Sequence, residues 1–599
     1  MFRRRRSRGA WLLAATLVTA LLCPVVNQAH GPDVKKKKTP KLDRVLQHAA
    51  DAGDLSPQRV IVRTRSGRTA VVADRMKKRG DRIETDHRRL EAFTATVRGE
   101  DLEALDADPD VESVSTDAII TANGDAESSS NNAEVENLLT TSLGLGKTKY
   151  EGDHVGIAVI DSGLEESEDL SGGRADRFFD FTTDGRAAHP YDDYGHGTHV
   201  ATLIAGEGKS SEVEVTKIDR GKPIRVKVRR FSGIAPKARI ISLKVLDGSG
   251  GGYTSSVLQA LEFAIENRDK LKIDIINLSL GHPVYESPDT DPLVRAVEDA
   301  VRAGIVVVAS AGNYGINQET GAIGYAGITS PGNAPSVITV GAVDTQDTAD
   351  HGDDLVATYS SRGPAWYSGL AKPDIVAPGS RLVAVGAYRG QLYRNHPERR
   401  VMGSRSDKAP RYLRLSGTSM AAAVTSGVIA LMIEANRDTH DAPLTPNLVK
   451  AILEYTALPI VSADPLSQGT GSLNGDGAVV LAESIDPSVP MGTWWLEGPV
   501  SPLTVIDGET LTWSQTVVWG NTVVWGNTVY ENRITWGQTV VWGTTVVWGS
   551  TVVWGTTDLV WDDPSIWSQT VVWGNSFVGT SNGGSLTPTT VVWGNLVDQ

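Results

Sequence analysis

The stretch VGIAVIDSG, residues 155–163, is an apolar run of strand length that ends in an acid followed by small residues. Similar apolar runs recur downstream, and segments with helical periodicity lie between them. The other predicted strands are residues 240–245, 273–278, 305–310 and 336–340, and the predicted helices include residues 199–205, 255–267, 292–303 and 418–436. Continuous apolar strands that alternate with helices are typical of a parallel sheet covered on both faces. We therefore expect an α/β domain with a parallel central sheet flanked by helices.

Two further short motifs accompany the acid Asp161 that ends the first run. GHGTH, residues 195–199, opens a predicted helix with His196, and SGTSMA, residues 416–421, opens another with Ser419. In open parallel sheets, strand ends and helix starts meet at the carboxyl edge, where ligands bind. A serine hydroxyl becomes a strong nucleophile when a histidine accepts its proton, and a carboxylate orients that histidine. Asp161, His196 and Ser419 are therefore the candidate catalytic set.

The order Asp, His, Ser along the chain is that of the subtilisins and differs from chymotrypsin and the α/β-hydrolases. On these three motifs, residues 150–484 resemble the subtilase family. The resemblance implies a serine endopeptidase that hydrolyses proteins or peptides through an acyl-enzyme, with no cofactor required for the chemistry. It also implies that Asn313, in the AGN motif of residues 311–313, donates its side-chain amide to the oxyanion.

The same resemblance implies where substrate binds. The two edges of the primary side-chain pocket would be Ser279, Leu280 and Gly281 on one side and Ala311 and Gly312 on the other. Gly251 and Tyr253 would belong to the strand that pairs with extended substrate. Three departures from the family pattern stand out: His282 replaces a common glycine, residues 314–329 form a longer segment, and Ala423 replaces a common proline. Ala423 should preserve the helix that Ser419 opens.

The resemblance makes a structural calcium ion possible rather than expected. Asp169 matches an aspartate that binds calcium in many relatives. The loop that would complete such a site is replaced here by residues 211–231, in which alternating valines and charges flank Asp219-Arg220-Gly221. This pattern predicts an inserted surface β-ribbon, either a solvated insertion or an arm that contacts substrate.

The N-terminus reads as a secretory signal peptide over residues 1–29, in which Arg3–Arg6 precede an apolar run over residues 10–22. The alternative is a retained membrane anchor. Cys23, the single cysteine, lies in this segment, so the mature chain would have neither disulfides nor thiolate metal sites. We expect a secreted protein, with the polar residues 30–56 as a connector.

Residues 57–121 predict a small α+β unit that resembles the inhibitory propeptide of subtilases, chiefly through residues 59–62 and 108–114. Such a unit is an intramolecular partner that covers the active-site cleft until it is cleaved off. Residues 122–149 would be the linker and processing region, with cleavage somewhere in residues 122–133. The alternative interpretation is a permanent accessory domain.

After a linker at residues 485–512, the sequence TVVWGN and its variants recur over residues 513–599, which predicts a β-rich repeat region. A row of exposed tryptophans would suit contact with glycans or a cell surface. The alternative is that Trp and Val form the core of the repeat.

The formal net charge of -14 argues against nucleic acid as a partner. A rival hypothesis from another class is a surface-binding protein that carries a degenerate protease domain. The complete set of Asp161, His196, Asn313 and Ser419 argues against degeneration. A maturation protease with a narrow substrate range would share the same chemistry.

Overall fold

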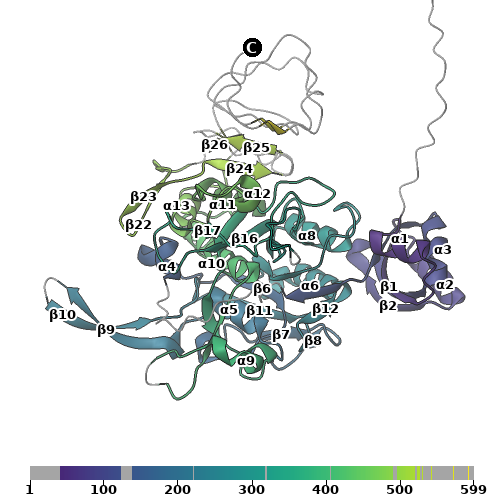
Figure 1. Ribbon diagram of the computed structural model, residues 1–599, viewed down its shortest axis with the longest axis horizontal. Coiled ribbons are helices and arrows are strands. Elements are labelled where there is room, and N and C mark those ends of the chain that lie inside the picture. Colours follow the sequence, from purple (N-terminus) through teal and green to yellow (C-terminus); the bar gives the residue numbers. More distant parts are fainter. Residues whose placement is uncertain are drawn as a thin grey trace, which may run out of the picture. The chain divides into compact units, whose positions relative to one another are not determined.

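The computed structural model describes residues 41–122, 138–219, 222–317, 320–404, 407–489 and 496–519, with short strand pieces up to residue 592. Figure 1 shows a small N-terminal unit, a larger α/β domain and a projecting two-stranded hairpin. Residues 1–40, which include the predicted signal peptide, lie outside the described residues.

The N-terminal unit, residues 41–122, contains a four-stranded antiparallel sheet in the order β2-β3-β1-β4. Val60 and Val62 of β1 face Ala95 and Phe93 of β3 in the register, and all four side chains are buried. Short helices pack on this apolar layer. The elements are α1 (Arg44–Asp51), β1 (Pro57–Thr64), α2 (Thr69–Arg79), β2 (Arg82–His87), β3 (Ala92–Arg98), α3 (Leu102–Ala107) and β4 (Val111–Thr116).

The unit begins earlier than the sequence pattern predicts. The Asp43 carboxylate caps α1 by accepting from the Leu46 amide at 2.8 Å, and Leu46 is fully buried in the core of the unit. The predicted connector over residues 30–56 is therefore wrong for residues 41–56, because the amphipathic α1 is part of the fold.

The α/β domain is built on a nine-stranded sheet in the order β17-β16-β15-β13-β6-β11-β7-β8, with β18 also paired to β16. All pairs are parallel except those that attach β17 and β8. The predicted parallel sheet is thus confirmed, with short antiparallel strands added to it. Its strands are β6 (Gly156–Asp161), β7 (Arg177–Asp180), β8 (Arg186–Ala187), β11 (Arg239–Lys244), β13 (Ile275–Leu278), β15 (Val306–Ser310), β16 (Ile338–Asp344), β17 (Leu355–Val356) and β18 (Ile375–Pro378).

Helices cover both faces of this sheet (Figure 1). Ile157 and Val159 of β6 pack in the cluster that holds α5 (His196–Ala205) and α10 (Thr418–Thr439). Ala158 and Ile160 pack in the opposite cluster with α6 (Thr254–Glu266) and α8 (Pro292–Arg302). Burial on both sides explains why the strand sequences are continuously apolar.

Helix α10 runs unbroken through Ala423, as the sequence predicts. It is long and apolar enough to cross a membrane, with a mean hydropathy of 1.5, but 94% of its apolar window is buried within the α/β domain. Its role as the central core helix accounts for its composition.

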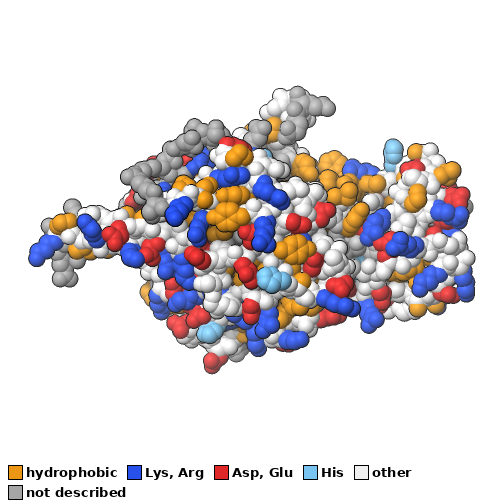
Figure 2. Space-filling model, turned by 90° about the horizontal axis from the view of Figure 1, so that it is seen from below, with side chains coloured by type: hydrophobic (Ala, Val, Ile, Leu, Met, Phe, Trp, Pro, Cys, Tyr) orange, Lys and Arg blue, Asp and Glu red, His pale blue; other side chains and the backbone are white. Residues whose placement is uncertain are grey.

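The predicted ribbon is an antiparallel hairpin of β9 (Glu212–Asp219) and β10 (Lys222–Arg229). The pairing places Lys227 opposite Glu214, and the Lys227 ammonium contacts Glu212 at 2.6 Å. Figure 2 shows side chains of both charges along this projecting arm.

The α/β domain also extends further toward both ends of the chain than predicted. Leu139 of α4 (Leu139–Ser142) lies in its core, within the predicted linker over residues 122–149. At the other end, Trp513 is buried beside Tyr455 at a ring separation of 6.2 Å and donates its indole N–H to Thr504. The predicted linker over residues 485–512 contains β22 (Leu503–Ile506) and β23 (Glu509–Thr512). The first tryptophan of the array is thus a core residue of the α/β domain.

Only parts of the tryptophan array are described. β24 (Thr516–Trp519) and β25 (Thr522–Trp525) form an antiparallel pair, and β26 (Val529–Tyr530) pairs with β27 (Val541–Trp542). β28 (Val571–Val572) and β29 (Val591–Val592) pair in parallel. Most of the predicted repeat region lies outside the described residues, so its β-rich character stays a prediction.

The remaining elements of the α/β domain complete its periphery. A second small sheet has the order β19-β21-β20. These elements are β19 (Leu382–Val385), β20 (Arg400–Val401), β21 (Tyr412–Leu415), α7 (Arg268–Leu271), α9 (Gln391–Asn395), α11 (Pro446–Thr456), α12 (Pro465–Gln468) and α13 (Gly475–Glu483).

Candidate active site

Asp161 and His196 form a buried pair at the carboxyl edge of the central sheet. Asp161 ends β6, and His196 is the first residue of α5. Asp161 Oδ1 accepts from His196 Nδ1 at 2.7 Å and from the Ser162 amide at 2.7 Å. The two side chains are 1% and 0% exposed, so the pair is shielded from water. Because a carboxylate only accepts, Nδ1 carries the proton in this contact, and Nε2 is then the basic nitrogen.

A second aspartate holds the start of α5 in place. Asp192 Oδ1 accepts from the Gly195 amide at 2.7 Å and from the Ser162 hydroxyl at 2.9 Å. Asp192 Oδ2 accepts from the amide and the hydroxyl of Thr198 at 2.8 and 2.7 Å. These contacts satisfy the otherwise unpaired amides of the first turn and lock the helix that carries His196.

The second histidine of the GHGTH motif has a different environment. His199 Nε2 lies 3.0 Å from the Leu413 carbonyl, to which it donates. Burial, together with the nearby His196, lowers the pKa of His199 to about 3. His199 therefore stays neutral and fastens α5 to β21.

Ser419 is the second residue of α10 and is fully buried. Its hydroxyl donates to the Ser279 carbonyl at 2.9 Å, and the Ser279 hydroxyl donates back to the Ser419 carbonyl at 3.0 Å. One edge of the predicted primary pocket is thus tied directly to the predicted nucleophile. The Ser419 hydroxyl has to rotate so that its single proton points to a base before the oxygen can attack.

Asn313 lies beside the start of α10 with its amide orientation defined. Its Oδ1 accepts from the Thr418 amide at 3.1 Å and from the Thr418 hydroxyl at 3.0 Å. The Thr418 hydroxyl also accepts from the Gly312 amide at 3.2 Å. The amide oxygen of Asn313 therefore faces Thr418, and its NH2 group faces the other way. This NH2 group is the part of the side chain that can donate to an oxyanion.

The predicted substrate-binding segments enclose a strand of the protein's own chain. β5 (Ile119–Ala122) lies between β12 (Gly251–Tyr253) and β14 (Leu280–Gly281) and is antiparallel to both. Ile120 faces Gly252 in the register and is fully buried in the apolar cluster beneath α6. The cleft therefore binds an extended backbone by β-augmentation, with one apolar side chain anchored.

Contacts next to β5 attach the N-terminal unit to the start of α6. Asp117 Oδ1 accepts from the Ser255 amide at 2.8 Å, and Oδ2 accepts from the Ser255 hydroxyl at 2.8 Å. Arg59 contacts Asp117 at 2.7 Å and lies 4.4 Å from the centre of the Tyr253 ring. Asp117 thus caps a helix of the α/β domain from the other unit.

The surroundings of Asp169 do not fit a calcium ion. Its carboxylate accepts from the Tyr412 hydroxyl at 2.6 Å and from the Ser210 amide at 3.0 Å. Burial and the charge of Asp169 raise the pKa of Tyr412, which keeps this donor protonated. The Arg174 guanidinium donates to the Asp169 carbonyl, to two further main-chain carbonyls and to Glu207. Calcium requires six to eight oxygen ligands, and here protein donors already engage the oxygens.

In the described part of the chain, one further cluster of side chains has the geometry to hold a metal ion. Ligand atoms of His440, Asp486 and Glu497 lie within 4.8 Å of one another. His440 Nε2 contacts the Glu483 carbonyl at 3.0 Å. The group lies at the surface beside α13, and it shares no residue with the site around Asp161 and Ser419.

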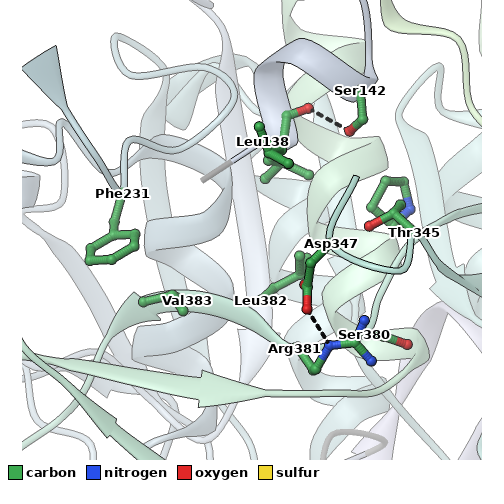
Figure 3. A pocket seen from close by; sticks show the side chains of 11 residues that line it. Leu138, Ser142, Phe231, Thr345, Asp347, Ser380, Arg381, Leu382 and Val383 are labelled. Atoms are coloured by element: carbon green, nitrogen blue, oxygen red, sulfur yellow. Dashed lines mark hydrogen bonds and ion pairs between the residues drawn. The ribbon is translucent and has the colours of Figure 1, made fainter. Parts of the chain in front are cut away.

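A separate small hollow of about 40 Å³ lies beside α4 and β19 (Figure 3). Arg381, the cation in it, contacts Asp347 at 3.0 Å and Asp344 at 2.6 Å. Its charge is therefore balanced within the protein, and the hollow has none of the groups of the catalytic set.

An α/β fold that brings a carboxylate, an imidazole and a helix-start serine to one edge, in the order Asp, His, Ser, is that of a subtilisin-like serine protease. The model of the Subtilase family matches residues 152–479, more than half of the chain. The chain therefore belongs to the subtilase family, and it is a serine endopeptidase.

Individual relatives agree with this assignment. The chain is 36% identical over 361 residues to serine protease AprX of Bacillus subtilis (strain 168), a match that covers 58% of this chain and 73% of AprX. It is 30% identical over 325 residues to subtilisin E of the same organism, covering 53% of this chain and 71% of that protein. The solved structure of fervidolysin from Fervidobacterium pennivorans, a keratinolytic enzyme related to subtilisin, has a TM-score of 0.53 at 20% identity. That match covers 72% of this chain and 61% of fervidolysin, and it shows the shared fold.

Proposed function

We propose that this protein is a secreted serine endopeptidase, made as a self-processed precursor, that uses Ser419 as nucleophile, His196 as base and Asp161 as the group that orients His196. The observation that carries this proposal is the buried 2.7 Å contact between Asp161 and His196 at the sheet edge where Ser419 opens α10.

In the proposed mechanism, His196 Nε2 takes the hydroxyl proton as Ser419 Oγ attacks the peptide carbonyl. The resulting oxyanion accepts from the Asn313 amide and from the Ser419 backbone N–H. His196 then gives its proton to the leaving amine, which breaks the C–N bond and leaves an acyl-enzyme. Water, deprotonated by His196, releases the acid and restores the Ser419 hydroxyl. Asp161 stabilises the imidazolium in both steps.

The N-terminal unit is proposed to be the inhibitory prodomain. Support comes from β5, whose residues Ile119–Ala122 occupy the cleft between β12 and β14, and from the Asp117 cap on α6. An extended strand in the cleft excludes substrate by direct competition. Cleavage of the chain beyond Ala122, within residues 122–133, would allow this unit to leave.

The proposal also covers where the protein acts and what its tryptophan-rich tail contacts. The basic and apolar N-terminus supports secretion, and the absence of any cysteine after Cys23 suits a chain that needs no disulfides outside the cell. The tryptophan-rich tail is proposed to contact glycans or a cell surface, which a pull-down on cell-wall material with and without residues 529–599 would test.

The test of the catalytic proposal uses the full-length precursor and its Ser419→Ala variant. We expect the parent to mature, to cleave casein and to be labelled by a serine-directed phosphonate. The Ser419→Ala precursor should do none of these alone but should be cut when mature parent enzyme is added. Maturation of the purified variant by itself would contradict the mechanism, and unlabelled, inactive parent protein would favour a degenerate protease domain.

A further inference from the structure

Three side chains of the metal-ligand type meet where two helices end. His440 directly follows α10, Asp486 lies three residues after α13, and Glu497 lies further along the chain. Ligand atoms of these residues lie within 4.8 Å of one another. None of the three belongs to the catalytic set or to the predicted substrate-binding segments. They are therefore candidates for a site of their own.

Hydrogen bonds fix the relative positions of the segments that carry these residues. The buried Asn436 side-chain amide donates to the carbonyls of Ala482 and Ile485, at 2.8 Å each, which joins the end of α10 to the end of α13. The Glu497 amide donates to the Ser484 carbonyl at 2.7 Å, which attaches the third segment. The three segments are thus assembled by contacts that do not involve the three ligand side chains.

The imidazole of His440 has one nitrogen suited to a metal ion. Its Nε2 lies 3.0 Å from the Glu483 carbonyl, which can only accept, so Nε2 carries the proton. In the neutral ring, Nδ1 then keeps a lone pair. A metal-binding histidine usually donates its other ring N–H to a carbonyl or carboxylate, which fixes the orientation of the ring. The Glu483 carbonyl supplies this partner for His440.

The two carboxylates differ in how firmly they are held. Asp486 Oδ1 accepts from the Ser488 amide at 2.8 Å and from the Ser488 hydroxyl at 2.6 Å, which orients this half-buried side chain. The Glu497 side chain is exposed and can rotate toward the other two. The cluster thus combines two oriented ligands with one adjustable ligand.

The electrostatic surroundings favour a cation. Helix α10, which has 22 residues, and helix α13 both end here, and a helix C-terminus carries a partial negative charge. Lys149 contacts Asp438 at 3.7 Å and Glu483 at 3.6 Å, so its charge is balanced by acids outside the ligand set. A bound divalent cation would be stabilised by both helix ends and by its two carboxylate ligands.

The ligand types indicate which ion would bind. One imidazole nitrogen and two carboxylate oxygens suit Zn²⁺, whereas Ca²⁺ takes six to eight oxygen ligands. Zinc holds such atoms at about 2.0–2.2 Å, so two ligand atoms on one tetrahedral ion lie about 3.4 Å apart. Rotation of the Glu497 side chain, with small shifts of the others, brings the three atoms to this spacing.

We propose that His440, Asp486 and Glu497 bind one zinc ion, with water as the fourth ligand, and that this ion fastens the segment after α13 to the end of α10. The ion would stabilise the chain where it passes from α13 to β22. The inference is separate from the proposed peptidase activity, because no ligand of the ion takes part in the proposed mechanism.

The test is a calorimetric titration of zinc chloride into the metal-free full-length chain, produced without a histidine tag. The chain carries Ser419→Ala so that the proposed self-cleavage cannot interfere. We expect one zinc ion per chain, bound also in millimolar calcium. His440→Ala, Asp486→Asn and Glu497→Gln should each weaken binding by more than the 10–100-fold that loss of an outer-shell partner typically costs.

Two matched variants control for charge and for imidazole content. Asp438→Asn removes a charge from the same helix end but no ligand, so binding should weaken by less than about fivefold. His154→Ala removes an imidazole that is 92% exposed and should leave binding unchanged. X-ray absorption at the zinc edge should show nitrogen and oxygen ligands at about 2.0–2.2 Å and no sulfur.

Hydrogen exchange measures whether the ion fastens the segment. Zinc should slow the exchange of backbone amides next to Glu497 in the Ser419→Ala chain. The same amides should not respond to zinc when the chain also carries His440→Ala.

A full-length chain that binds no zinc would overturn the inference, as would binding that the three ligand variants leave unchanged. Displacement of zinc by millimolar calcium would show that the ion type is wrong. An equally large loss in Asp438→Asn would show that general negative charge, and not this ligand set, attracts zinc. Unchanged exchange next to Glu497 in saturating zinc would refute the fastening role. None of these outcomes bears on the proposed function, whose failure is read from casein cleavage and phosphonate labelling of the parent.

Discussion

The hydroxyl of Thr418 offers a sharp test of how the oxyanion site is assembled. Thr418→Val keeps the shape of the side chain and removes its hydroxyl. The change deletes the 3.0 Å contact with Asn313 Oδ1 and the 3.2 Å contact from the Gly312 amide. The contact from the Thr418 amide to Asn313, at 3.1 Å, stays. Asn313 should therefore lose part of its orientation while its donor group is retained.

The size of the effect follows from the two lost hydrogen bonds. Each is worth roughly 0.5–1.5 kcal/mol net, so the change should cost about 1–3 kcal/mol. If that loss falls on the transition state, kcat should fall by about 5–150-fold. KM should change little, because in the proposed mechanism the oxyanion forms only as the bond to Ser419 forms. Removing the donor altogether, as in Asn313→Ala, should cost about 10²–10³ in kcat.

The assay is steady-state hydrolysis of a chromogenic peptide by Thr418→Val, Asn313→Ala and the double variant. If Thr418 acts by positioning Asn313, the double variant should be no slower than Asn313→Ala. Thr425→Val is the matched control, since its hydroxyl bonds to Ala421 within the same buried helix. It should leave kcat near that of the parent. Additive losses in the double variant, or an equal loss in Thr425→Val, would refute the positioning role.

Three other predictions concern stability and docking. Burial, with the charge of a neighbouring aspartate, raises the pKa of Glu286 from 4.5 to about 8. The folded full-length chain holds this proton when the unfolded chain has lost it, so its unfolding free energy should fall as pH rises from about 4.5 to 8. Denaturant titrations should show a flatter pH profile in Glu286→Gln, and an unchanged profile would exclude Glu286 as the source. The Tm of the zinc-free protein should be the same in chelator as in added calcium. Tyr412→Phe, which removes the donor to Asp169, should lower the unfolding free energy by about 1–3 kcal/mol, and Tyr393→Phe should lower it less. A large loss of Tm in chelator would show that calcium binds. Asp117→Ala removes a helix cap worth about 1–2 kcal/mol. In the proposed maturation of the full-length chain, activity should therefore appear sooner in this variant. Asp110→Ala, in which the lost side chain pairs only within the N-terminal unit, should mature at the parent rate.

Several features could be read from local sequence alone. The strands of the central sheet are continuously apolar because both faces are buried, and Asp161, His196 and Ser419 lie at strand ends and helix starts. Helix starts were also recognisable, since α5, α6, α8 and α10 begin within three residues of their predicted positions.

Other features gave no usable local signal. Asp192 and Thr418 hold the site together through contacts with segments that are remote along the chain. Asp192 stands in a polar run before the helix, where a capping aspartate is ordinary, so only its burial reveals its importance. Residues near Leu46 and Trp513 look like linker and repeat sequence, because each provides only a few of the apolar contacts of its core.

The sequence by itself determined the class of this protein: the order of the three motifs, and the apolar strands that end beside them, define a subtilase. Only the tertiary structure decided which contacts hold the residues around the active site and which segments fill its cleft and pocket. Asp169, a possible calcium ligand by sequence, accepts from Tyr412, β5 lies in the cleft, and Thr329 lies between the two pocket edges. The physical reason is that catalysis needs residue types that local motifs preserve. Hydrogen-bond satisfaction and pocket volume depend on which remote segments meet, and packing alone settles that.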